Sequence, residues 1–274
     1  LAMLFPLLTG GINLSVTFTA NLAGLAAAWV FQAYGGVDAP GYVFVIAIVA
    51  ALAAGGAAGF MTGAAIAYTR AHPILITLSM MIFLRGLGEF LTRGGDVSGF
   101  PSYLAPVGHG TILGLPVPLL IFIACVALWS LVLSRFKLGF GLLMIGSNIE
   151  SARYSGLNTR KIIILVYTLS GLMCAVAGMI MLARFNSVRV GHGESYLLIT
   201  VLAAFLGGID PFGGFGRVLP VFVALIVLQL LSSGLNLMGA NQHLATALWG
   251  VLMVVVMASR TVLSDYFTSR KRKG

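Results

Sequence analysis

Residues 43–67 read VFVIAIVAALAAGGAAGFMTGAAIA, a run without a single charged residue. A helix rises about 1.5 Å per residue and the hydrocarbon core of a bilayer is about 30 Å thick, so roughly 17 to 25 apolar residues make one crossing. Within the run, Gly55, Gly59 and Gly63 recur at every fourth position, which lets helix backbones approach closely in lipid. This stretch predicts a membrane-spanning helix that packs tightly against another.

Similar apolar runs continue along the chain, and one of them carries Gly171, Ala175 and Gly178 at nearly the same spacing. Eight complete spans are predicted: Leu14–Tyr34, Val43–Ala67, Ile74–Leu91, Leu119–Leu133, Ile162–Ala183, Tyr196–Gly208, Val218–Leu231 and Leu244–Ser259. Part of another ends near Leu8. Since the chain begins at Leu1 inside an apolar stretch, we expect N-terminal helices to be missing from this numbering.

The composition of the 274 residues agrees with these spans. Hydrophobic residues make up 59% and charged residues 8%, too few to cover the surface of a water-soluble fold. Repeated long runs also exclude a single anchor and a barrel of short alternating strands. The predicted fold class is an all-α, polytopic membrane protein, with residues 1–274 forming one transmembrane domain. Cys125 and Cys174 lie within apolar runs and are interpreted as small core residues.

The distribution of positive charge predicts the orientation. The net charge of +9 is concentrated in a few inter-helix loops and the tail 270–273, which fits membrane topology better than nucleic-acid binding. If the eight spans alternate, Arg70, Arg217 and the basic residues of 135–161 share one side with the tail, whereas Arg93, Arg184 and Arg189 face the other. The positive-inside rule then predicts a cytoplasmic C-terminus and a cytoplasmic loop at 137–161.

That loop is the one long polar segment between apolar runs that carries several basic residues, and it reads KLGFGLLMIGSNIESARYSGLNTRK. It predicts one or two short helices, with Ser147 or Asn148 capping the turn and Gly156 with Asn158 leading out of it. We expect this element to be gripped by a cytoplasmic partner and to transmit that partner's closure to the membrane helices. The predicted coupling residues are Gly146, Asn148, Glu150, Ser151, Ala152, Arg153 and Gly156. A solvated linker is the alternative.

A second group of polar residues lies in apolar surroundings. Asn13, Thr17 and Asn21 are four apart and predict a polar stripe on one helix, with Ser15 beside it. Amides and hydroxyls suit a path for a polyhydroxylated solute because they offer donors and acceptors without a charge. With Thr77 these residues form the predicted translocation path. Hydrogen bonding between helices is the other interpretation, and the two are about equally supported.

Signatures of catalysis are missing from the sequence. No GxxxxGK[ST] loop and no Gly-Lys dipeptide occurs, so if ATP powers this protein a second subunit hydrolyses it. His192 and Glu194 have the H-x-E spacing of zinc deaminases without the required PCxxC. Charged residues within the spans are scarce apart from Arg85 and Glu89, which argues against an ion-coupled carrier acting alone. Such a carrier, or a channel, remains the alternative.

Four segments together resemble the permease subunits of bacterial ABC importers for monosaccharides, of the ribose, xylose and galactose type, to which autoinducer-2 permeases are related. Residues 9–16 (TGGINLSV) are similar to that family's TGGIDLSVG, and residues 72–78 (HPILITL) to its PxFIxTLG. Residues 146–158 (GSNIESARYSGLN) are similar to GxNxEAARLSGI, and 206–216 (LGGIDPFGGFG) to LGGxxxxGGxG. Asn13 stands where the family usually has Asp, and Thr17 where it usually has Gly.

The resemblance implies a type II-like permease of ten helices in the bacterial inner membrane. It would pair with an identical or related permease, bind two ATPase subunits in the cytoplasm and receive a small polar solute, expected to be a monosaccharide, from a periplasmic binding protein. Autoinducer 2 or a nucleoside is the alternative solute. The segment around Glu150 would be the coupling helix. The chain itself would hold no cofactor, since ATP and Mg²⁺ would bind the ATPase partner.

Overall fold

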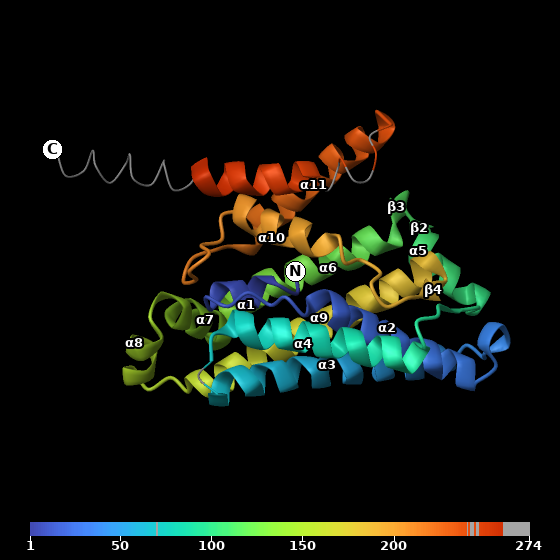
Figure 1. The fold of residues 1–274 in the computed structure, drawn as a ribbon, viewed down its shortest axis with the longest axis horizontal. Helices are drawn as coiled ribbons and strands as arrows, with labels where there is room; N and C mark the ends of the chain where they lie inside the picture. The colour runs from blue at the N-terminus through green and yellow to red at the C-terminus, as the bar shows by residue number, and fades with distance from the viewer. Residues whose placement is uncertain (70, 240, 242–243, 245–246, 260–274) are drawn as a thin grey trace.

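Two helices of 27 residues, α3 (Val43–Thr69) and α9 (Thr159–Phe185), lie along each other and form the most extensive helix pair of the fold (Figure 1). The computed structural model describes residues 1–69, 71–239, 241, 244 and 247–259. A Cβ added to Gly55 would lie 2.5 Å from the carbonyl oxygen of Gly171, and one added to Gly59 would meet the carbonyl of Tyr167. The predicted glycine packing is confirmed, because backbone faces backbone at this crossing.

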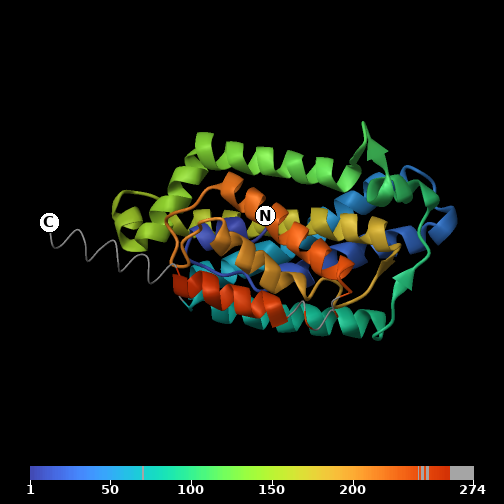
Figure 2. The same ribbon diagram turned by 90° about the horizontal axis from the view of Figure 1, so that it is seen from above.

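The remaining helices pack beside and above this pair, mostly with parallel or antiparallel axes, and α3 lies along the lower edge of the bundle in Figure 1 (Figures 1 and 2). They are α1 (Leu4–Leu8), α2 (Val16–Ala33), α4 (Pro73–Thr92), α5 (Ala105–His109), α6 (Val117–Arg135), α7 (Lys137–Ser147), α8 (Ile149–Tyr154), α10 (Tyr196–Leu206) and α11 (Val218–Leu237). A further apolar helix covers Ala247–Ser259. Helix α2 is the most enclosed candidate span and lies against both α3 and α9.

Six of the predicted spans are helices long and apolar enough to cross a membrane: α2, α3, α4, α6, α9 and α11. The other two contain shorter helices, α10 and Ala247–Ser259, and part of the predicted Leu244–Ser259 span lies outside the described residues. Helix α10 ends at Leu206 because Gly207 lies against the backbone of Val221 and Gly208 takes a φ of +90°. The all-α, polytopic class is confirmed.

Short strands and 3-10 turns occur at the end of the bundle opposite α8. They are η1 (Gly36–Asp38), η2 (Ser102–Leu104), β1 (Val97–Ser98), β2 (Thr111–Ile112), β3 (Leu115–Pro116) and β4 (Ser187–Val188). Strands β1 and β4 pair antiparallel, with Val97 opposite Val188, and β2 pairs with β3. The pairing of β1 with β4 therefore joins the segment after α4 to the segment after α9.

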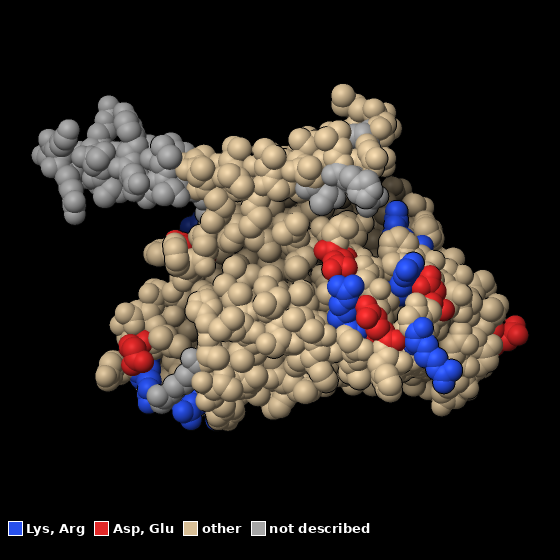
Figure 3. Space-filling view, in the orientation of Figure 1, with Lys and Arg blue, Asp and Glu red and all other residues tan. Residues whose placement is uncertain are grey.

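On the face shown in Figure 3, charged side chains form a small cluster at the end with α8 and a larger one over the half that carries the short strands, with an uncharged stretch between them. The end that carries the short strands has ion pairs of Arg189 with Asp96 at 3.5 Å and of Arg85 with Glu89 at 3.0 Å. The end that carries α8 has Glu150 and several arginines. An uncharged band between two charged ends is the surface expected of a protein that spans a bilayer.

Candidate coupling element and solute path

Helix α8 is a short, exposed helix between α7 and α9, at one end of the bundle (Figure 1). Asn148 caps it, because its side-chain oxygen accepts a hydrogen bond of 3.0 Å from the backbone N–H of Ser151. The hydroxyl of Ser147 instead donates to the carbonyl of Leu143 within α7. Of the two predicted capping residues, Asn148 is thus the one that caps.

One buried residue attaches α8 to the rest of the protein. Ala152 is fully buried, whereas Glu150, Ser151 and Arg153 are exposed. The helix is followed by Gly156, whose φ of +83° favours glycine, although open space surrounds it. Asn158 then accepts a hydrogen bond of 3.1 Å from the N–H of Lys161 and caps α9. A rigid, capped helix with an exposed polar face can be gripped from outside.

Helices α7 and α8 are the two short helices that the segment 137–161 predicted, but α7 is not a polar, solvated element. It is apolar, it buries Leu142 completely, and it packs against α1, α6 and α9. Gly146 lies where three segments meet, since a Cβ added there would overlap the carbonyl oxygen of Leu8 and the N–H of Gly214. Those two groups form a hydrogen bond of 2.9 Å with each other. Gly146 therefore belongs to a packed junction behind α8 and not to its exposed face.

Three of the predicted path residues take part in hydrogen bonds within the chain. The side-chain oxygen of Asn13 accepts from both the N–H and the hydroxyl of Ser15, and its amide donates to the Ser170 hydroxyl at 3.1 Å. Thr77 donates to the carbonyl of Ile12 at 2.8 Å. Asn13 precedes α2, so it does not continue the stripe of Thr17 and Asn21 along that helix. These contacts fasten the entry of α2 to α4 and α9.

Replacing Asn13 tests this polar cluster. Asn13→Leu is expected to destabilise the protein by about 1 to 3 kcal/mol, because the buried hydroxyls of Ser15 and Ser170 lose their partner. Asn13→Asp keeps an acceptor for both serines and should lose less. Thermal unfolding of the purified protein in detergent measures the difference. Equal midpoints for Asn13→Leu and wild type would contradict a stabilising cluster.

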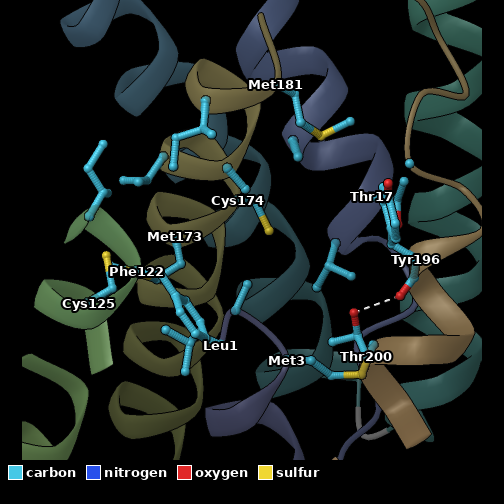
Figure 4. A pocket seen from close by; sticks show the side chains of 18 residues that line it. Leu1, Met3, Thr17, Phe122, Cys125, Met173, Cys174, Met181, Tyr196 and Thr200 are labelled. Carbon is cyan, nitrogen blue, oxygen red and sulfur yellow. Dashed lines mark hydrogen bonds between the residues drawn. The ribbon is translucent and has the colours of Figure 1, made fainter. Parts of the chain in front are cut away.

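The other two predicted path residues, Thr17 and Asn21, lie beside cavities. Thr17 lines a cavity of about 260 Å³ between α2, α6, α9 and α10, whose walls are mostly apolar (Figure 4). The Thr200 hydroxyl in that cavity is already used, since it donates to the carbonyl of Tyr196 at 2.7 Å. Asn21 is buried, and its amide nitrogen has no hydrogen-bond partner among the described residues. The five residues thus do not line one common cavity.

Arg85 and Glu89, the charged residues within a predicted span, form an ion pair at 3.0 Å, and Arg85 also reaches Glu194 at 3.4 Å. All three side chains are about half exposed at the end opposite α8. This exposed network joins α4 to the segment before α10. It resembles a structural contact more than an ion-coupling site enclosed in the membrane.

A multi-pass bundle with a protruding helix at one charged end defines a membrane transport subunit. Residues 1–257 match the family described as "Branched-chain amino acid transport system / permease component", and the chain belongs to this family. Membership makes it the permease subunit of an ABC importer, not an enzyme and not a carrier acting alone.

Individual relatives are autoinducer 2 import system permease proteins named LsrD. The one from Yersinia enterocolitica is 32% identical over 268 residues, which cover 96% of this chain and 79% of the relative. The one from Yersinia pseudotuberculosis is 30% identical, with 96% and 78% covered. No solved structure matches the chain.

Sequence reasoning missed Tyr167 and Ser170 as residues of interest. Ser170 completes the Asn13 cluster, and Tyr167 is a buried tyrosine whose hydroxyl has no partner among the described residues. Both lie inside an apolar run, where a single polar residue gives no positional signal. The hydrogen-bond partner of Ser170, Asn13, lies 157 residues away along the chain.

Proposed function

We propose that this chain forms the solute path of an ATP-driven importer in the bacterial inner membrane and that α8 is its coupling helix. Two separate ATPase subunits would bind on the side of α8, where they would hold the ATP and Mg²⁺. A periplasmic binding protein would deliver the solute at the opposite end, and a second permease, identical or related, would complete the path. The observation that carries this proposal is the exposed polar face of α8 on a capped, anchored helix.

The solute we propose is a small polar molecule, either autoinducer 2 or a monosaccharide. The relatives support the former, since they are named as autoinducer 2 import permeases. We further propose that the path runs near Thr17 and Asn21. The buried Asn21 amide without a partner is the group best suited to meet a hydroxylated solute or a water. Asn13, Ser15 and Thr77 would then support the path by holding α2 in place.

The proposed orientation places residues 137–161 and the C-terminus in the cytoplasm. Arg135, Lys137, Arg153, Arg160 and Arg217 are exposed at the end that carries α8. This supports the positive-inside assignment, while the basic tail lies outside the described residues. Residues 1–274 would act as one domain, in which a push on α8 reaches Leu8 and Gly214 through the junction at Gly146.

A charge reversal on α8 tests the coupling role. Glu150→Lys is expected to lower the amount of ATPase that copurifies with the permease about tenfold, because a like charge at an interface weakens docking by 1.4 kcal/mol or more. Glu150 is exposed, so the fold should persist.

The matched control is Asp38→Lys, which makes the same charge change at an exposed residue at the opposite end. It should leave copurification unchanged. Normal ATPase recovery with Glu150→Lys, together with normal import of autoinducer 2 or monosaccharide, would contradict the proposal that α8 is the coupling helix.

A further inference from the structure

A polar cavity of about 660 Å³ lies behind α8, between the end of α3, the beginning of α4 and the first turns of α9. Its lining includes Glu150, Arg153, Asn158, Arg160 and Tyr167. From these residues we infer that the cavity binds a phosphate group, carried by a phospholipid headgroup or by a soluble anion. The inference does not depend on the coupling role of α8.

The charges at the cavity favour an anion. Arg153 and Arg160 line it, and Glu150 is the acidic residue of its lining. Among the described residues, the ion pairs are at the other end of the molecule, so neither arginine is neutralised by a carboxylate there. The guanidinium of Arg160 rests 5.6 Å from the ring centroid of Tyr68, which holds it beside the cavity. Guanidinium groups bind phosphate oxygens in pairs of parallel hydrogen bonds.

Two helix N-termini add to this positive field. Helix α4 begins at Pro73 and α9 at Thr159, both in the lining, and neither has an acidic residue in its first turn. The first turn of α9 contains Arg160 and Lys161 instead. Cations at the positive end of a helix dipole are unfavourable by about 0.3 to 1 kcal/mol each. A bound phosphate is negatively charged, so its own interaction with these helix ends would be favourable.

A buried donor without a partner supplies an independent indication of a ligand. Tyr167 lines the cavity and is 1% exposed, and its hydroxyl has no hydrogen-bond partner among the residues described. It lies eight residues after Thr159, so about 12 Å along α9 from the helix start. A buried hydroxyl without a partner is unfavourable by about 1 to 3 kcal/mol, and an oxygen of a bound molecule would satisfy it.

The position of the cavity suits a phospholipid. Its lining comes from α8 and from the first residues of α4 and α9, at the end of the bundle where helices would meet the headgroups of a bilayer. Ile66, Ile145 and Ile163 line it beside the polar groups and offer apolar contacts to the glycerol and the first acyl carbons. A free phosphate would use the same arginines without those contacts.

Native mass spectrometry of the full chain, purified from nanodiscs of phosphatidylglycerol and phosphatidylcholine, tests the inference. Wild type is expected to retain phosphatidylglycerol, and the double variant Arg153→Gln/Arg160→Gln about thirtyfold less, because two basic residues near an anionic headgroup are lost and together they correspond to about 2 kcal/mol. Tyr167→Phe, which removes only the hydroxyl, should retain about threefold less. Glu150→Gln should retain more than wild type.

The control variant Arg135→Gln/Arg217→Gln removes two exposed arginines outside this cavity and should retain as much lipid as wild type. Titration with inorganic phosphate separates the two sources. Phosphatidylglycerol that stays bound in excess phosphate identifies a lipid site, and saturable phosphate binding lost in the cavity double variant identifies a soluble anion. Equal lipid retention in wild type and the cavity double variant, without phosphate binding, would overturn the inference. Because no ATPase is present, this result is separate from the docking test of Glu150→Lys.

Discussion

Gly171→Leu is expected to prevent the permease from folding. A Cβ at this position would overlap the carbonyl oxygen of Gly55 and lie 3.0 Å from the Cα of Gly59. The obstructing atoms belong to the backbone of α3, so no rotamer change can relieve the overlap, and α3 and α9 would have to separate. Close backbone packing is the main attraction between helices in lipid, and we expect a loss of more than about 3 kcal/mol.

The yield of monodisperse protein in detergent, and its thermal midpoint where protein is recovered, measure this effect. Gly86→Leu is the matched control, because Gly86 lies on α4 with open space around the position of its Cβ. That variant should behave like wild type. A Gly171→Leu protein that elutes and unfolds like wild type would show that the α3 and α9 pair does not determine stability.

Gly146→Val is expected to disable the transporter even if the variant inserts into the membrane. Its side chain would occupy the space of the hydrogen bond between the Gly214 N–H and the Leu8 carbonyl, and would press on Gly213 as well. This junction connects α7, and through it α8, with the end of α1 and with the segment between α10 and α11. Breaking it should lower stability by about 2 kcal/mol and should separate movement of α8 from movement of the bundle.

Import of autoinducer 2 or monosaccharide by the complete importer in proteoliposomes, compared with its ATP hydrolysis, measures that separation. We expect import to fall more than tenfold while ATP hydrolysis continues. Gly156→Asn is the control on the other side of α8, since open space surrounds Gly156 and Asn tolerates its positive φ. Import and hydrolysis that fall in equal proportion in Gly146→Val would contradict a role of the junction in coupling.

Local features of the candidate site followed from short-range rules. Asn148 caps α8 and Gly156 ends it, both by interactions within a few residues, and so the sequence indicates them directly. Residues 137–147 are different. Their glycines and lysine resemble a loop, yet Leu142 is fully buried because α1 and α9 cover it. That burial depends on segments far away in the chain.

The predicted path residues also show the difference between what neighbouring residues indicate and what distant segments decide. A stripe of amides and hydroxyls predicts polar surroundings, but it cannot say whether the partner is a solute or another helix. The structure brings Ser170 to Asn13 and the carbonyl of Ile12 to Thr77. Asn21 receives no such partner.

By itself, the sequence determined the membrane class, six of the eight predicted spans, the glycine faces and the capped helix between α7 and α9. Each of these depends on composition, on helical periodicity or on contacts within one turn. Only the tertiary structure decided that Gly146 is a junction, that three path residues are already bonded, and that Arg153, Arg160 and Tyr167 surround one cavity. These features arise where separate helices meet, and the order of residues along one helix does not specify which neighbour it will face.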